Sequence, residues 1–122
     1  MSLGICLLSG CLGKYTRFSE YCGTYEGMFP AADGPGIQTT IKLDKQNHFE
    51  QRQVYLGEKN GDFTESGSYH KHGSVLSLRT DNGEMMFYQI ETGQIRLLDM
   101  EQEPISGALA DYYILKKVAD CQ

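Results

Sequence analysis

The sequence contains no tryptophan, no cluster of lysine or arginine, and no apolar run of membrane-spanning length. Its 11 basic residues are outnumbered by 16 acidic ones, which gives a formal net charge of −5. Nucleic acids and anionic membrane surfaces are bound through basic patches, so we expect neither as a partner. A transmembrane helix needs roughly 18 or more apolar residues in a row, and we therefore expect none.

Recognisable catalytic motifs are also missing. No Ser, Cys or Thr lies in a nucleophile elbow or beside a base motif, and there is no His-x-x-x-His or paired-carboxylate pattern. Glu26 and Asp33 are more simply a strand-surface glutamate and a turn-stabilising aspartate than an acid–base pair. The sequence therefore predicts neither an enzyme nor a bound cofactor.

The residues that are present favour a small all-β protein. Fourteen glycines, eight tyrosines and 40% hydrophobic residues suit a turn-rich β fold, and 122 residues are enough for one domain. Short turn signals separate β-type segments at about the 8–12-residue spacing of sandwiches and barrels. The predicted strands cover residues 23–29, 38–43, 48–56, 63–69, 75–80, 85–91, 94–100 and 112–118, with one short helical turn near 106–110.

Short connections make consecutive strands antiparallel neighbours, and closing the sheet removes its exposed edges. We therefore predict a small antiparallel meander β-barrel of about eight strands. Alternation is regular in the second strand, where Thr39 and Ile41 face inward. In the third strand Phe49 and Val54 have opposite parity, and we expect a β-bulge near residues 51–53 to reconcile them.

The predicted interior contains polar side chains as well as aliphatic ones. We expect inward hydroxyl and amide groups from Tyr25, Thr39, Tyr55, Tyr88 and Gln89. A barrel of this kind can hold one small ligand in its mouth, and these residues are the candidates to line such a site. Alternatively, the same groups pair with one another in a filled core, because eight strands leave an interior only just wide enough for side chains.

The first residues differ from the rest of the chain. An apolar run over residues 3–11 ends in Leu-Ser-Gly-Cys, which matches the lipobox of bacterial lipoprotein signal peptides. Such a signal makes Cys11 the lipidated residue, and Leu12 after it favours the outer membrane over the inner one. We expect residues 1–13 to be a truncated lipoprotein signal with its tether, and residues 14–122 to be the barrel domain. The alternative is an incidental apolar N-terminal segment.

A lipobox implies export, and hence an oxidising compartment. The two cysteines of the body, Cys22 and Cys121, lie at the start of the first predicted strand and just after the last. Those strands are neighbours in a closed meander, so the two residues are disulfide candidates, although sequence alone does not fix connectivity.

Metal binding has one candidate pair. His70 and His72 are two apart on a strand, so both project from one face and are able to chelate a metal ion such as copper. Tyr69, the residue before His70, is expected to face inward, which puts both histidines on the outer face beside a turn. A solvated hairpin is the competing interpretation.

Several fragments point to a known family when they are taken together. The sequence couples Gly-Thr-Tyr-Glu-Gly at 23–27 to a Pro- and Gly-rich loop at 30–36 and an alternating strand at 37–43, and further segments follow at 55–57, 63–69, 97–105 and 113–117. In order and spacing this is similar to the NlpE N-terminal domain family of copper-homeostasis envelope lipoproteins. The resemblance spans about residues 21–118 and implies a lipocalin-like barrel. Where the family usually carries Cys-x-x-Cys, this chain has Ala31 and Gly34.

The functional expectation follows from the lipobox, the missing thiols and the resemblance. We expect an envelope lipoprotein, anchored through Cys11 in the outer membrane and facing the periplasm, that acts as a non-catalytic binding or stress-sensing module with a possible envelope protein partner. One alternative is a lipocalin-like carrier of a small apolar ligand or metal ion. Another is an inhibitor of an envelope-directed hydrolase.

Overall fold

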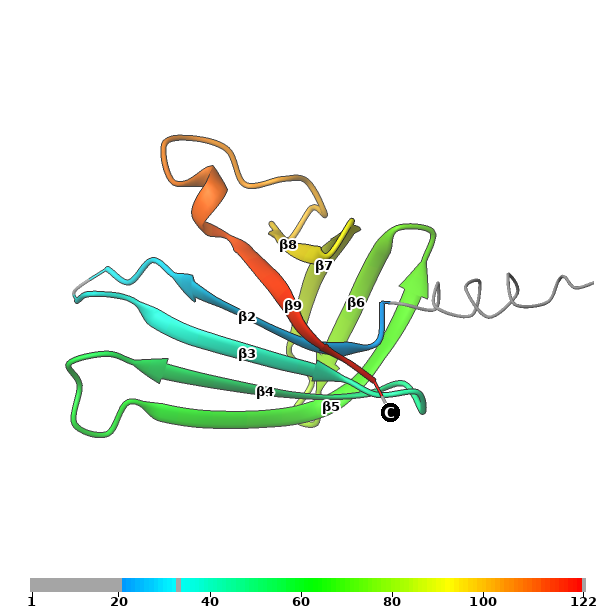
Figure 1. Cartoon of the computed structure of the whole chain (residues 1–122), viewed down its shortest axis with the longest axis horizontal. Coiled ribbons are helices and arrows are strands. Elements are labelled where there is room, and N and C mark those ends of the chain that lie inside the picture. The colour runs from blue at the N-terminus through cyan, green and yellow to red at the C-terminus, as the bar shows by residue number, and fades with distance from the viewer. Residues whose placement is uncertain (1–20, 33, 122) are drawn as a thin grey trace, which may run out of the picture.

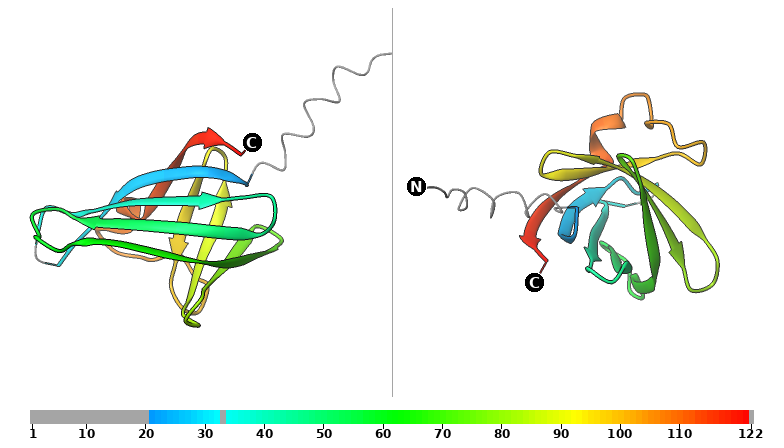
Figure 2. Two further views of the ribbon diagram at one scale, coloured as in Figure 1. Left: turned by 90° about the horizontal axis from the view of Figure 1, so that it is seen from below. Right: turned by 90° about the vertical axis from the view of Figure 1, so that its right-hand side faces the viewer.

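The computed structural model describes residues 21–32 and 34–121, and the regular secondary structure within them is β-strand apart from one short 3₁₀ turn (Figure 1). Neighbouring strands pair antiparallel in sequence order, and the last strand returns to the first to close a barrel (Figure 2). The elements are β2 (Gly23–Phe29), β3 (Ile37–Leu43), β4 (His48–Tyr55), β5 (Asp62–His72), β6 (Val75–Thr80), β7 (Met85–Glu91), β8 (Gln94–Leu98), the 3₁₀ turn η2 (Ala110–Tyr112) and β9 (Ile114–Asp120). The predicted all-β, eight-stranded antiparallel barrel is confirmed.

The predicted strand bounds are correct for β2, β6 and β7, and they differ by a few residues elsewhere. The largest difference is in β5, which continues to His72 because it pairs with β6 up to the tight turn at Gly73. Gly73 has a φ of 60°, a left-handed conformation that glycine adopts without steric cost. The helical turn predicted near 106–110 lies slightly later, at η2.

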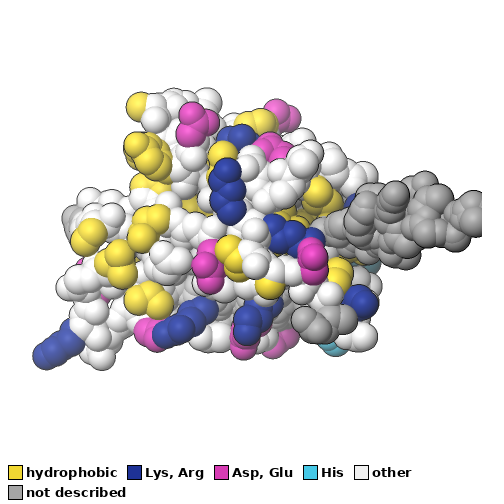
Figure 3. All heavy atoms as spheres, in the orientation of Figure 1, with side chains coloured by type: hydrophobic (Ala, Val, Ile, Leu, Met, Phe, Trp, Pro, Cys, Tyr) yellow, Lys and Arg dark blue, Asp and Glu magenta, His cyan; other side chains and the backbone are white. Residues whose placement is uncertain are grey.

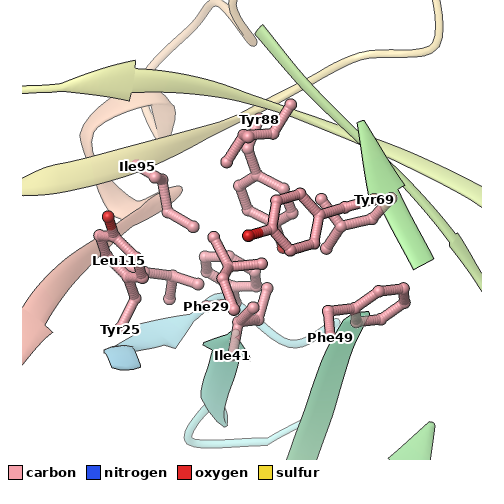
Figure 4. Close-up of a cluster of buried hydrophobic side chains, with 11 residues drawn as sticks. Tyr25, Phe29, Ile41, Phe49, Tyr69, Tyr88, Ile95 and Leu115 are labelled. Atoms are coloured by element: carbon pink, nitrogen blue, oxygen red, sulfur yellow. The ribbon is translucent and has the colours of Figure 1, made fainter. Parts of the chain in front are cut away.

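A cluster of buried side chains, with members from all eight strands, fills the barrel. Aromatic and aliphatic residues point toward one another in its interior (Figure 4). Ile41, Leu76 and Leu115 are completely shielded from solvent. The buried cluster comprises Tyr25, Phe29, Ile41, Leu43, Phe49, Tyr69, Leu76, Leu78, Tyr88, Ile95 and Leu115.

The third predicted strand is regular, and the bulge expected near 51–53 is absent. The register of β4 runs without a shift against both β3 and β5, so Phe49, Gln51, Gln53 and Tyr55 all face inward. Val54 consequently faces outward. The prediction was wrong because it took the inward positions to be apolar, whereas β4 turns two glutamines inward. The one irregularity that we find in the described pairings separates Thr24 from the following residue, in β2 against β9.

One end of the barrel is flared. β5 pairs with β4 over residues 62–68 but with β6 only over residues 67–72, so its first half has a strand on one side only. This half of β5 lies along the lower margin of the molecule on the left in Figure 1. Gly67 stands where β6 begins to pair, and any Cβ there would overlap the carbonyl oxygen of Arg79.

The opposite end of the barrel is held together by a disulfide between Cys22 and Cys121, whose Cα atoms are 5.4 Å apart. It joins the residue before β2 to the residue after β9. The predicted signal and tether, residues 1–13 with Cys11, lie outside the residues that the structure describes. No helix in the described part of the chain is long and apolar enough to cross a membrane.

Candidate functional site

The flared end carries a groove between the β2–β3 loop and the β4–β5 loop. Its volume is about 580 Å³. The two loops are tied together by a hydrogen bond from the amide of Leu56 to the carbonyl oxygen of Gly36, at 3.0 Å. The lining residues are Pro30, Ala31, Ala32, Gly34, Gly36, Ile37, Tyr55, Leu56, Glu58, Asn60, Gly61 and Phe63.

Two aromatic rings give the groove its apolar character. Tyr55 is the last residue of β4 and Phe63 is the second residue of β5, and their ring centroids lie 5.7 Å apart at an interplanar angle of 90°, an edge-to-face contact. The Phe63 side chain remains 54% exposed, which is unusual for a phenylalanine in a regular strand. The pair provides the kind of exposed aromatic contact that protein-binding surfaces favour.

A polar layer lies beneath these rings on the inner face of the sheet. Thr39 is fully buried and donates its hydroxyl to the carbonyl oxygen of Ile37 at 3.2 Å, while the amide of Gln53 donates to the Thr39 hydroxyl at 3.4 Å. Gln51 is only 5% exposed, and its side-chain amide has no hydrogen-bond partner among the described residues. The residue opposite Gln51 on β5 is Glu65. The sequence analysis did not predict that Gln51, Gln53 and Glu65 face inward. For the two glutamines the signal was available, because they share the parity of Phe49 in β4.

The two positions that match the family's thiols both line the groove. Ala31 is partly buried and Gly34 is exposed. A Cβ built on Gly34 would meet only the carbonyl oxygen of Leu56, at 3.5 Å, which is an ordinary contact. The loop therefore has room for a side chain at Gly34. The structure does not forbid a cysteine at this position; the sequence simply has none there.

The histidine pair lies away from this groove. His70 and His72 project from the outer face of β5, both exposed, with ring centroids 5.6 Å apart. The third histidine, His48, faces the carboxylate of Asp44 at 3.8 Å. No group of three or more His, Cys, Asp or Glu side chains in the described part of the chain is arranged to hold a metal ion.

The five residues proposed for the interior divide into three groups. Tyr25, Thr39 and Tyr88 are buried inside the barrel, and Tyr55 faces inward at the flared end. Gln89 was wrongly placed: it pairs with Val75 and Arg96 on the outer face of the barrel. Tyr88 faces inward, and successive strand residues point to opposite faces, so its neighbour must face out.

The buried tyrosines differ in how their hydroxyl groups are satisfied. Tyr69 donates to the carbonyl oxygen of Asp44 at 2.5 Å, and Tyr25 donates to that of Tyr21 at 2.9 Å. The hydroxyl of Tyr88 has no partner among the residues that the structure describes. Burial raises the pKa of both Tyr69 and Tyr88 well above the ordinary value, because the charged phenolate is poorly solvated there.

Exposed apolar side chains gather at the flared end and on the segment that projects between β8 and β9. On the face shown in Figure 3 the yellow side chains concentrate over these parts, while charges of both signs are interspersed elsewhere. Among the described residues, the large exposed hydrophobic ones in these parts are Met28, Phe63, Met100, Leu109 and Tyr112, and Val118 is exposed elsewhere, near the end of β9. Exposed apolar patches of this kind are typical of interaction surfaces.

Comparison with known proteins assigns the chain to a family. Residues 25–108 match the model of the NlpE N-terminal domain. The chain is 30% identical over 86 residues to lipoprotein NlpE of Escherichia coli (strain K12), a match that covers 69% of this chain but only 36% of that relative. This chain therefore spans about a third of the length of the curated relative.

Solved structures show the same barrel. A putative lipoprotein from Shewanella oneidensis aligns with a TM-score of 0.70 and 37% identity, over 80% of this chain and 89% of that one. The Cpx pathway activator NlpE from Escherichia coli aligns with a TM-score of 0.66 and 28% identity, over 70% and 46% of the two chains. Lipoprotein YedD from Klebsiella pneumoniae has a TM-score of 0.54 at 11% identity over 80% and 70%, a likeness in fold alone.

Proposed function

The chain belongs to the NlpE N-terminal domain family, and on that premise we propose that it is a non-catalytic binding or stress-sensing module of the bacterial envelope, which meets a protein partner through its flared end. One observation carries this proposal. Eleven buried side chains occupy the barrel interior, whereas Phe63 and other apolar side chains are exposed at the flared end and beside it. A filled barrel with an exposed aromatic surface favours binding at that surface over transport inside the barrel.

The proposed anchor is Cys11 in the lipobox at residues 8–11, which would hold the barrel at the outer membrane facing the periplasm. The family supports the lipoprotein class, and Leu12 supports the outer membrane. The disulfide at Cys22 and Cys121 agrees with this assignment, because such bonds persist in the oxidising periplasm.

Copper chemistry at the family's loop is not part of the proposal. The groove has Ala31 and Gly34 in place of the thiols, and neither offers a metal ligand. The description of the Escherichia coli relative as a Cpx pathway activator concerns that protein. For this chain we propose only envelope stress sensing, and we propose that the partner contacts the surface around Tyr55 and Phe63.

An envelope-stress reporter in a bacterial host tests the proposal. The chain is fused to a complete lipoprotein signal at Cys11 and overproduced as wild type, as Phe63→Ala and as Val118→Ala. Val118→Ala is the matched control. Val118 is 55% exposed and Phe63 is 54% exposed, but the two residues lie on different parts of the barrel. We expect wild type and Val118→Ala to induce the reporter and Phe63→Ala to fail at equal protein levels. Equal induction by all three would refute a role for the flared end.

A lipocalin-like carrier remains the second candidate, and one observation favours it. The amide of Gln51 and the hydroxyl of Tyr88 are buried without partners among the described residues, and a bound ligand would supply them. Native mass spectrometry of protein purified from the envelope distinguishes the two functions. A carrier would retain a small-molecule mass adduct, while a protein-binding module would not.

A further inference from the structure

The first half of β5 has a free backbone edge. In an antiparallel pair, alternate residues direct both backbone groups toward the same neighbouring strand. Gly61 directs its carbonyl oxygen to β4, where it accepts from the amide of Tyr55 at 2.7 Å, whereas Ser66 directs its carbonyl to the other side, where it accepts from the amide of Asp81 at 2.9 Å. Asp62 and Thr64 share the parity of Ser66, so their N–H and C=O groups point to the side where β6 does not reach.

The inner face beside this edge is amphipathic. Phe63 and Glu65 are the two inward residues of the unpaired half, and Phe63 is 54% exposed. Directly opposite Glu65 on β4 lies Gln51, the buried amide that has no partner among the described residues. A side chain entering along the edge would therefore meet the ring of Phe63 at one position and the carboxylate of Glu65 at the next.

The unpaired side-chain charge on the edge itself is acidic. Glu65 has no ion-pair partner in the part of the chain described, and the neighbouring β6–β7 turn exposes Asp81 and Glu84. The carboxylate of Asp62 does not contribute, because Arg52 neutralises it on the outer face at 2.7 Å. An incoming segment that carries a basic residue is thus favoured over an acidic one.

We propose that the edge of β5 at residues 62–66 binds an extended segment of a partner protein as an added strand, with a basic side chain against Glu65 and an apolar side chain against Phe63. Main-chain hydrogen bonds to Asp62 and Thr64 provide affinity, and the alternating side chains provide specificity. This deepens the proposed function, on which it rests, by naming how the partner is recognised. A second copy of this chain is disfavoured, because each copy carries a net charge of −5.

A peptide titration followed by NMR tests the inference without the stress reporter, so failure of either proposal is recognised separately. The oxidised full chain with Cys11→Ser is ¹⁵N-labelled and titrated with the capped peptide Thr-Lys-Thr-Val-Thr. In an antiparallel arrangement its Lys lies opposite Glu65 and its Val opposite Phe63. We expect saturable shifts of the amides of residues 62–66. The same peptide with Glu in place of Lys should bind at least tenfold more weakly, and Glu65→Gln should remove that difference.

Two changes separate an added strand from a general surface contact. Thr64→Pro removes the N–H that points to the free edge, where proline is tolerated, so it should abolish binding while Thr64→Ala retains it. Methylating the central peptide nitrogen removes the reciprocal bond, in which the peptide N–H donates to the carbonyl oxygen of Thr64, without altering the protein, and it should also abolish binding. The inference is overturned by the absence of shifts up to millimolar peptide, by shifts confined to the groove loops, or by equal affinity for the Lys and Glu peptides. Concentration-dependent shifts at residues 62–66 without peptide would instead identify a second copy as the occupant and overturn it.

Discussion

Removal of the disulfide should destabilise the barrel strongly. The bond joins residues 99 apart in sequence and closes almost the whole described chain into one loop. Restricting the unfolded chain over such a loop is worth up to about 4–5 kcal/mol in the chain-entropy model. Because one kcal/mol corresponds to about 4 °C for a domain of this size, we expect Cys22→Ala/Cys121→Ala to lower Tm by up to about 15–20 °C.

Urea unfolding of three samples measures this effect: oxidised wild type, wild type in reductant, and the double variant. Reduced wild type keeps both sulfurs and serves as the control for packing, which matters because Cys22 is only 3% exposed. We expect the two uncrosslinked samples to share a lower midpoint and a steeper m value, since their unfolded chains expose more surface. Coincident midpoints for all three samples would refute the reasoning.

Three further predictions concern the buried hydroxyl groups and the loop. Tyr69→Phe loses the bond to Asp44 and should cost about 1 kcal/mol in urea unfolding. Tyr88→Phe removes a hydroxyl that has no partner among the described residues and should be neutral or stabilising, and the reverse order would contradict the assignment. Burial raises the pKa of both tyrosines, so only the unfolded chain loses these protons near pH 10 and stability should fall as pH rises above that value, which pH-dependent melting checks. Ala31→Cys/Gly34→Cys should gain Zn²⁺ binding by calorimetry, and silence there would show that the groove cannot bring two thiols together.

The extent to which the sequence predicted the fold depended on how regular each strand was. β6 and β7 were predicted to the residue, because apolar residues alternate there between glycine turns that end the strands. β4 was misread, since Gln51 and Gln53 occupy inward positions that a hydrophobic pattern assigns to apolar residues. The interior tolerates them because the sheet flares at that end, a tertiary feature that strand periodicity does not contain.

The candidate site was less predictable than the fold. The resemblance placed Ala31 and Gly34 in a loop, but the groove also needs the β4–β5 loop, which approaches only in the folded barrel. Gln89 was assigned to the interior by residue type against its own parity, and the register corrected it. The free edge of β5 arises because β6 pairs with only half of that strand, and no local sequence signal marks where pairing stops.

Photo-crosslinking in the living envelope tests the central claim most directly. A photoreactive phenylalanine analogue is placed at position 63 on the flared end or at position 118 on β9, two sites of equal exposure. The account predicts a discrete protein adduct from position 63 that is absent from position 118. The same crosslinked proteins from both positions would contradict it. So would the absence of a crosslinked protein from position 63, if the purified chain also retains a bound small molecule in native mass spectrometry.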